Sequence, residues 1–401
     1  MGAYVAGAVG FGPAPVRAAA PPSISAPAAI LVQPSTGDVV FARRADAPRP
    51  IASTTKLMTA LLALDRLALD DVLTAVPYHA LPAESVIGLR PGDRMKVRDL
   101  LRGLLLASGN DAAQTLAVGI AGSTQAFVRL MNDRARRLGL RATHFTNPVG
   151  LDEPGNHASA ADLAKLALVL RRSAFFRATT DLPRATLADG DRTLTVVNRN
   201  ALVREVPFVD GIKTGHTLQA GYVLVGSATR AGVNVISVVL GEPSEAARDA
   251  DTLALLRYGL SRYHVVRAVT KGRALASVKL RYRDERAPLV AGTTVSRTVR
   301  RGRRLAVRLV GVPRQLDGPL PTGARVATVA VLQGGRVVAR TPLVTAAPIS
   351  AASFAQRLRS YAVRPLTLLA VAVLATCSLQ LVVLRRRAHR RRHRREHPEL
   401  A

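Results

Sequence analysis

Three short groups of residues in the 401-residue chain carry side chains that could perform acyl transfer. In chain order they are Ser53-Thr54-Thr55-Lys56, Ser108-Gly109-Asn110 and Lys213-Thr214-Gly215. Each group alone is too short to be informative. Together they supply a nucleophilic hydroxyl, a candidate base, a second hydroxyl, an amide and a second cation. The combination indicates nucleophilic catalysis through an ester on a serine.

Ser53 and Lys56 have the spacing of a nucleophile and its base. Residues three apart share one face of a helix, and a hydroxyl at a helix start lies where free backbone N–H groups favour negative charge. A lysine with its usual pKa of about 10.4 is a poor base at neutral pH. Lowering that pKa by about three units takes about 4 kcal/mol, which burial or a second cation can supply. Lys213 is the candidate for that cation.

The second motif supplies groups that could transfer a proton to the leaving amine and orient the substrate. The hydroxyl of Ser108 could relay a proton to that amine. The side-chain amide of Asn110 could orient the substrate amide or Lys56. No histidine is needed as a base once Lys56 is available, so we interpret His144 and His157 as loop residues.

The third motif is typical of the edge of a sheet that binds an extended peptide by strand addition. Lys213 and Thr214 would hold a terminal carboxylate. Gly215 has no side chain, so the peptide backbone could approach closely. The backbone N–H groups of Ser53 and His216 would form the oxyanion hole.

Lysine usage strengthens this interpretation. The chain has 51 arginines and only six lysines, and two of the six fall in these motifs. Arginine keeps its proton and cannot act as the base. The net charge of +30 comes from arginines with no basic stripe alternating with aromatics, so we expect no nucleic-acid binding. The charge indicates a solvated, arginine-rich surface or, alternatively, attraction to anionic wall polymers or lipid head groups.

The elements that must position these motifs alternate between strands and helices. Residues 29–32 and 39–41 are expected to form strands, as are residues 221–229 and 233–240. Apolar periodicity predicts helices at residues 53–64, 97–106, 111–120, 125–138, 159–170 and 245–260. Strands at both ends of a helical middle indicate an α/β domain with an antiparallel sheet, which we place at residues 27–263.

The remainder of the chain divides by composition. Residues 1–26 resemble a signal-peptide leader that lacks its positive start. Short alternating segments at residues 278–283, 304–310, 325–332 and 336–343 predict a small β-rich domain at residues 264–347. Residues 348–364 read as a linker. The single cysteine, Cys377, allows no disulfide within one chain, and no spacing predicts a metal site or cofactor.

Residues 365–384 predict a transmembrane helix. From Pro365 to Leu384 no residue is charged, and twenty residues of helix span about 30 Å, the thickness of a bilayer core. Eight arginines follow in residues 385–401, a pattern typical of a cytoplasmic flank. We therefore expect a single-pass membrane protein, with its C-terminus in the cytoplasm and everything before Pro365 outside.

Longer strings around the motifs resemble one family. They are residues 52–60, 108–113, 145–151 (Phe-Thr-Asn-Pro-Val-Gly-Leu) and 210–217 (Asp-Gly-Ile-Lys-Thr-Gly-His-Thr). Over about residues 28–262 the chain resembles the low-molecular-mass penicillin-binding proteins of the D-alanyl-D-alanine carboxypeptidase family. The resemblance implies a penicillin-binding-protein fold with a helical subdomain and a metal-free acyl-enzyme mechanism on Ser53. It implies a peptidoglycan pentapeptide as substrate and β-lactams as ligands; protein partners stay unknown.

The resemblance also points to Arg248, which would help to bind the substrate carboxylate; the alternative is an arginine on an exposed helix face. Three other functions stay open. A serine β-lactamase shares the motifs, with Glu153 as the nearest candidate for its added glutamate. A D,D-endopeptidase would use the same acyl-enzyme. A wall-binding protein without activity is disfavoured because Ser53, Lys56, Asn110 and Lys213 are all present.

Overall fold

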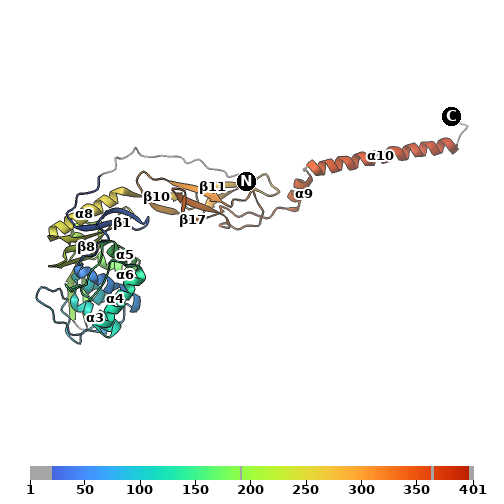
Figure 1. Cartoon of the computed structure of the whole chain (residues 1–401). Helices are drawn as coiled ribbons and strands as arrows, with labels where there is room; N and C mark the ends of the chain where they lie inside the picture. The colour runs from blue at the N-terminus through green and yellow to red at the C-terminus, as the bar shows by residue number, and fades with distance from the viewer. Residues whose placement is uncertain (1–19, 190–191, 363–364, 397–401) are drawn as a thin grey trace. The chain divides into compact units, whose positions relative to one another are not determined.

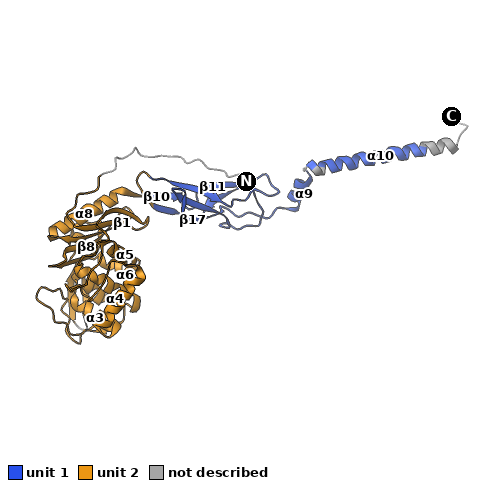
Figure 2. Ribbon diagram, in the orientation of Figure 1, with its two compact units in different colours: residues 1–10, 266–297, 303–401 blue, residues 11–265, 298–302 orange. Residues whose placement is uncertain are grey.

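The computed structural model describes residues 20–189, 192–362 and 365–396, and the chain divides into two compact units. The larger unit holds residues 11–265 and 298–302, and the smaller unit holds residues 1–10, 266–297 and 303–401 (Figure 2). The expected leader falls mostly on residues 1–19, which lie outside the described residues. All three sequence motifs lie in the larger unit.

The larger unit is built on a five-stranded antiparallel sheet in the order β2-β1-β9-β8-β7 (Figure 1). Strand β1 pairs with β9, which confirms that the predicted strands at the two ends of this segment meet in one sheet. Strand β7 carries the Lys-Thr-Gly motif and lies at the edge. The strands are β1 (Ala28–Gln33), β2 (Asp38–Arg43), β7 (Val209–Thr217), β8 (Gly221–Arg230) and β9 (Val233–Glu242).

Both faces of this sheet are covered by helices. In β9, Val235 and Val239 pack into the core that includes α8 (Glu245–Arg262). Their neighbours Ile236 and Val238 point the other way, into the core of the helical part. Successive side chains of a strand face opposite sides, so a strand covered on both faces is apolar throughout. This arrangement explains why the sequence of β9 reads as an almost unbroken apolar run.

The helices that carry the first two motifs pack on the inner face of the sheet. The predicted helices are confirmed, although several bounds differ by a few residues. Ser159 begins its helix as expected, because its side chain accepts a hydrogen bond from the N–H of Asp162. The elements are the 3₁₀ helix η1 (Ala52–Thr55), α1 (Lys56–Arg66), α2 (Val97–Arg102), α3 (Asn110–Ala121), α4 (Thr124–Leu138), α5 (Ala160–Leu170), α6 (Ala174–Thr180) and α7 (Ala201–Glu205).

The helix predicted at residues 97–106 differs from expectation in its second half. After α2 the chain widens into a π-helical turn, η2 (Gly103–Ala107), which ends at Ser108 in a left-handed conformation with φ of 65°. The N–H of Gly109 then bonds to the carbonyl of Gly103 at 3.1 Å. Such turns are frequent at functional sites. Here the turn ends directly before the second motif. The left-handed Ser108 then changes the direction of the chain between η2 and the helix that begins at Asn110.

A second sheet in the larger unit was not predicted. It has the order β3-β4-β5-β6, and the outermost strands come from distant parts of the chain. Its strands have three to six residues each, so any apolar alternation is too brief to distinguish them from loops. They are β3 (Val72–Thr74), β4 (Arg94–Lys96), β5 (Arg184–Asp189) and β6 (Arg192–Val197).

The smaller unit contains the predicted β-rich segment. Its main sheet has six strands in the order β14-β16-β17-β12-β11-β15, with Leu289, Val329, Val331 and Leu343 fully buried in its core. The strand expected at residues 278–283 is wrong at its end, because β11 stops at Leu280 and Tyr282 turns with φ of 66°. The strands are β11 (Ala274–Leu280), β12 (Arg286–Ala291), β14 (Leu305–Val310), β15 (Gln315–Leu316), β16 (Arg325–Gln333) and β17 (Arg336–Thr345); β10 (Tyr263–Val269) and β13 (Val295–Arg300) form a separate pair.

The C-terminal part of the chain is helical. Helix α9 (Phe354–Ala362) precedes α10 (Pro365–Glu396), which continues beyond the predicted end at Leu384 into the arginine-rich tail (Figure 1). Residues Leu368–His389 are long and apolar enough to cross a membrane. The side chains of this segment are exposed, so its apolar surface is not buried against the rest of the protein. Such exposure is expected of a helix that contacts lipid.

Candidate active site

Ser53 lies in η1 and Lys56 begins α1, so the short helical turn places both side chains on one face. The Nζ atom of Lys56 lies 2.9 Å from the Oγ of Ser53. Lys56 is fully buried. Burial lowers its pKa from 10.5 to about 7; the negative charges of Glu84 and Asp111 raise it, and the positive charge of Arg199 lowers it. The site therefore holds a hydroxyl beside an amine that is partly neutral at neutral pH.

The main chain of residues 147–151 fixes the ammonium end of Lys56. Nζ donates a hydrogen bond to the carbonyl of Val149 at 2.5 Å, a contact that sequence reasoning missed. The Oδ1 of Asn147 accepts the N–H groups of residues 149, 150 and 151 at 3.2, 2.6 and 3.2 Å. Gly150 has φ of 88°, and a Cβ there would lie 2.0 Å from the carbonyl oxygen of Ala52. The Asn-Pro-Val-Gly string thus shapes a loop that packs directly on η1.

The second motif lies beside the first. Asn110 begins α3, and its Nδ2 donates to a carboxylate oxygen of Glu84 at 2.7 Å. The carboxylate of Asp111 accepts the backbone N–H groups of residues 87–89 at 2.9–3.0 Å. The N–H of Asn110 also bonds to the carbonyl of Ser85 at 2.7 Å. The loop before α2 is therefore fastened to this motif by main-chain and side-chain bonds.

Strand β7 brings the third motif against the nucleophile. A Cβ on Gly215 would lie 2.9 Å from the backbone nitrogen of Ser53, so the strand and η1 touch where the oxyanion hole was expected. Lys213 is buried, and its Nζ donates to the carbonyl of Thr214 at 2.8 Å. His216 is exposed at the edge and stacks on Tyr222, with ring centroids 4.0 Å apart.

Electrostatics link the two lysines. Burial holds the pKa of Lys213 well below its usual value of 10.5, and the charges of Lys56, Arg199 and Arg248 lower it further. Such a cluster of cations is costly unless an anion binds beside it. The arrangement is suited to a ligand with a carboxylate near Lys213 and an acyl carbon near Ser53.

Comparisons with known proteins agree with this geometry. Residues 15–244 match the family model of D-alanyl-D-alanine carboxypeptidases. The chain belongs to the D-alanyl-D-alanine carboxypeptidase family. It is 30% identical to the carboxypeptidase DacF of Bacillus subtilis over 82% of this chain and 87% of that protein. It is 33% identical to DacD of Escherichia coli over 85% of this chain and 91% of that protein.

Solved structures of related proteins share the fold. Penicillin-binding protein 5 of Haemophilus influenzae superposes with a TM-score of 0.59 at 29% identity, over 83% of this chain and 99% of that one. The DD-transpeptidase of Streptomyces K15 superposes with a TM-score of 0.56 at 33% identity, over 61% of this chain and all of that one. The expected α/β fold of the penicillin-binding-protein type is confirmed.

Two arginines act through their charge on Lys213. Arg248 is only 3% exposed, so its interpretation as an exposed helix arginine is wrong. Its guanidinium pairs with Glu245 at 2.7 Å and Asp249 at 2.8 Å. Arg199 was missed because it follows β6, which the sequence did not predict. Its Nε donates to the carbonyl of Ala107 at 3.0 Å, and its charge acts on both motif lysines.

The other candidates lie apart from these contacts. His144 and His157 pair with each other through two backbone hydrogen bonds of 2.9 Å. Glu153 is exposed, and its carbonyl accepts the N–H of Asn156. Over residues 20–189, 192–362 and 365–396, no group of three or more histidine, cysteine, aspartate or glutamate side chains could hold a metal ion.

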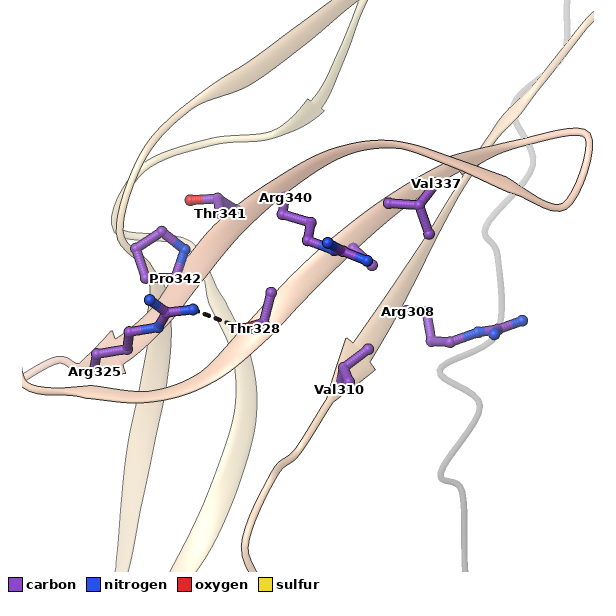
Figure 3. A pocket seen from close by; sticks show the side chains of 9 residues that line it. Arg308, Val310, Arg325, Thr328, Val337, Arg340, Thr341 and Pro342 are labelled. Atoms are coloured by element: carbon purple, nitrogen blue, oxygen red, sulfur yellow. Dashed lines mark hydrogen bonds between the residues drawn. The ribbon is translucent and has the colours of Figure 1, made fainter.

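A hollow in the smaller unit contains none of the motif residues. It has a volume of about 530 Å³ and lies on strands β14, β16 and β17 (Figure 3). Arg308 and Arg340 lie opposite each other across Ala330 in the cross-strand register, and Arg325 bonds to Thr328 at 3.2 Å. The lining residues include three arginines and no acid, so this surface is strongly positive.

Proposed function

We propose the following chemistry for this serine-type D-alanyl-D-alanine carboxypeptidase, which hydrolyses the terminal D-alanine from peptidoglycan stem peptides. The observation that carries it is the buried Nζ of Lys56, 2.9 Å from the Oγ of Ser53. In its neutral form Lys56 accepts the Ser53 proton as the oxygen attacks the carbonyl carbon before the terminal D-alanine. The carbonyl oxygen becomes an oxyanion, which the N–H groups of Ser53 and His216 bind.

The tetrahedral intermediate then collapses to an ester. The C–N bond breaks, and the proton taken by Lys56 passes to the leaving nitrogen, with the hydroxyl of Ser108 as relay. D-alanine departs with a neutral amine. Water attacks the ester, Lys56 again takes the proton, and the Ser53 hydroxyl is restored as the shortened peptide leaves. Asn110 orients the amide of the peptide while these transfers occur.

The terminal carboxylate of the substrate binds at the cationic side of the site. Lys213 and Thr214 on β7 hold it, with Arg248 and Arg199 adding positive charge. The buried Lys213 has a pKa well below its usual value. A carboxylate beside it favours its charged form. The peptide lies along the edge of β7 as an added strand, because that edge is unpaired in the described sheet.

β-Lactams follow the same path until the ester forms. The acyl carbon of the lactam accepts Ser53, and the ring nitrogen stays attached to the acyl group, so it cannot diffuse away. We propose that residues 27–263 contain all the catalytic groups, and that residues 264–347 connect them to the linker at residues 348–364.

The chain is held at the bacterial cell membrane by α10, with the catalytic unit outside and the tail from residue 385 in the cytoplasm. The support is the apolar segment Leu368–His389 and the arginines that follow its uncharged part. The lipid bilayer is thus a partner of this protein, and the positive tail lies against anionic head groups.

Product analysis tests the function directly. The protein is incubated with a pentapeptide ending in D-Ala-D-Ala, and mass spectrometry should show loss of one alanine. Intact mass after penicillin should show one penicilloyl group, which Ser53→Ala abolishes. Cleavage of a cross-linked dimer of two stem peptides would indicate D,D-endopeptidase activity. Rapid hydrolysis of penicillin without a stable adduct would indicate a β-lactamase. An unchanged pentapeptide with no adduct would reject the proposal.

A further inference from the structure

Glu84 is a carboxylate in the active site that none of the three motifs includes. One of its oxygens, Oε2, accepts a hydrogen bond from Nδ2 of Asn110 at 2.7 Å and another from the hydroxyl of Tyr78. Its other oxygen accepts the N–H of Leu81 at 3.2 Å. Three donors therefore meet at one carboxylate, on a loop 26 residues before the start of the helix that Asn110 begins.

This contact determines which way the amide of Asn110 faces. An ionised carboxylate only accepts hydrogen bonds, whereas a side-chain amide has an NH₂ end and an oxygen end. Only one orientation of Asn110 satisfies Glu84, the one with Nδ2 toward the carboxylate. The oxygen Oδ1 is then presented at the other end of the amide, as an acceptor for an N–H of substrate or lysine.

Glu84 also remains charged in this environment. Burial alone would raise its pKa, but the hydrogen bonds from Tyr78, Asn110 and the backbone of Leu81, together with the charge of Lys56, hold its pKa below the usual range. Burial and the bond to Glu84 raise the pKa of Tyr78, so the phenol remains a donor. The network is therefore a fixed negative charge with neutral donors around it.

Four charged groups act on Lys56. Glu84 and Asp111 favour its protonated form, while Arg199 and Lys213 oppose it. The carboxylate of Asp111 accepts hydrogen bonds from the backbone N–H groups of residues 87–89. Glu84 differs from it, because the same carboxylate that acts on Lys56 also holds the side chain of Asn110.

We propose that Glu84 is a positioning residue of the acyl-transfer site, which fixes the amide of Asn110 and sets the pH range in which Lys56 accepts the proton of Ser53. The proposal rests on the roles given above to Lys56 and Asn110. It assigns two separable effects to the side chain of Glu84. Its charge acts on Lys56, and its length allows the hydrogen bond to Asn110.

Two substitutions separate these effects. Glu84→Gln removes the charge but keeps an oxygen that can accept from Asn110. The midpoint of the pH profile of acylation should move to lower pH, because Lys56 loses a negative neighbour. Glu84→Asp keeps the charge but shortens the side chain by one methylene. Its midpoint should stay near that of the unmodified protein, and its plateau rate should fall about tenfold, the effect of losing one hydrogen bond to a charged group.

The assay measures the rate of ester formation with fluorescent penicillin between pH 5 and 9 on the full-length protein in detergent. Glu153→Gln is the matched control, since it removes an exposed carboxylate that makes no side-chain contact with the motifs, and it should reproduce the unmodified profile. Thermal melts show whether each variant is folded. If one variant does not fold, the other still tests its own effect, the charge in Glu84→Gln or the hydrogen bond to Asn110 in Glu84→Asp. An unmoved midpoint in Glu84→Gln, or an unchanged plateau in Glu84→Asp, overturns the proposal. No labelling of the unmodified protein would instead reject the proposed function.

Discussion

Replacing Lys56 by arginine should abolish acylation, and the structure gives the size of the effect. The difference between the usual lysine value of 10.5 and the lowered pKa of about 7 corresponds to about 5 kcal/mol. At pH 7 about half of the Lys56 side chains are neutral, whereas an unshifted lysine would be neutral in roughly one molecule in 3,000. Burial therefore increases the population of the active base about a thousandfold. Arginine keeps its proton, so Lys56→Arg should lose acylation by at least this factor.

The corresponding change at Lys213 should have a different result. Arginine there keeps a positive charge that can bind a carboxylate, so some activity should remain and the substrate concentration needed should rise. Burial holds the pKa of Lys213 well below its usual value, whereas an arginine there keeps its charge. A permanent charge at this position lowers the pKa of Lys56 further. The alkaline-going rise of acylation should therefore move to lower pH in Lys213→Arg.

The measurement is the rate of penicillin acylation from pH 5 to 9 for the unmodified protein and both variants. Lys165→Arg is the control, because Lys165 is half-exposed and bonds to Asp162 outside the motifs. The unmodified protein and this control should show a rise with its midpoint near pH 7. If Lys56→Arg acylates as well as Lys213→Arg at every pH, Lys56 is not the base and the division of roles is wrong.

Three other predictions concern separate parts of the molecule. Gly150→Ala should lower the free energy of unfolding by about 3 kcal/mol or more, because its Cβ would lie 2.0 Å from a carbonyl oxygen. Gly122 also has a positive φ, but a Cβ there would have no atom within 4 Å, so Gly122→Ala should lower it by about 1 kcal/mol. Equal thermal melts of the two variants would contradict this packing. Ser53→Ala should lose all fluorescent penicillin labelling, and persistent labelling would assign the nucleophile elsewhere. A protease added outside intact cells should leave a tag fused after Ala401 undigested, whereas its digestion would reverse the proposed topology.

The parts of the fold that sequence predicted are those specified by local patterns. Helices such as α5 were found from apolar periodicity and a capping serine, both properties of neighbouring residues. The strands β3 to β6 were missed because they are short and because one of their pairings, Met95 in β4 with Asp189 in β5, joins segments 94 residues apart. The π-helical turn before Ser108 likewise has no local signature.

The same distinction applies to the candidate site. Ser53, Lys56 and Asn110 were recognisable because their spacing within short motifs carries chemistry. Glu84 lies 26 residues from Asn110, and its contact depends on how a loop folds back onto α3. Arg199 lies just after β6, a strand that was itself unpredicted. The Val149 carbonyl could not be found from side-chain types at all, because it is a backbone group and any residue would supply it.

The two buried motif lysines differ from the buried Arg248 in how the fold accommodates their charge. Arg248 is buried with two carboxylates, Glu245 and Asp249, as a group that cannot lose its charge must be. Lys56 and Lys213 are buried as well, yet over the described residues neither has an acidic side chain within 4.0 Å. A lysine can be buried in this way because it can give up its proton instead of keeping an unpaired charge. The ability to lose the proton, which lets the fold bury these lysines, is thus the property that makes Lys56 a base.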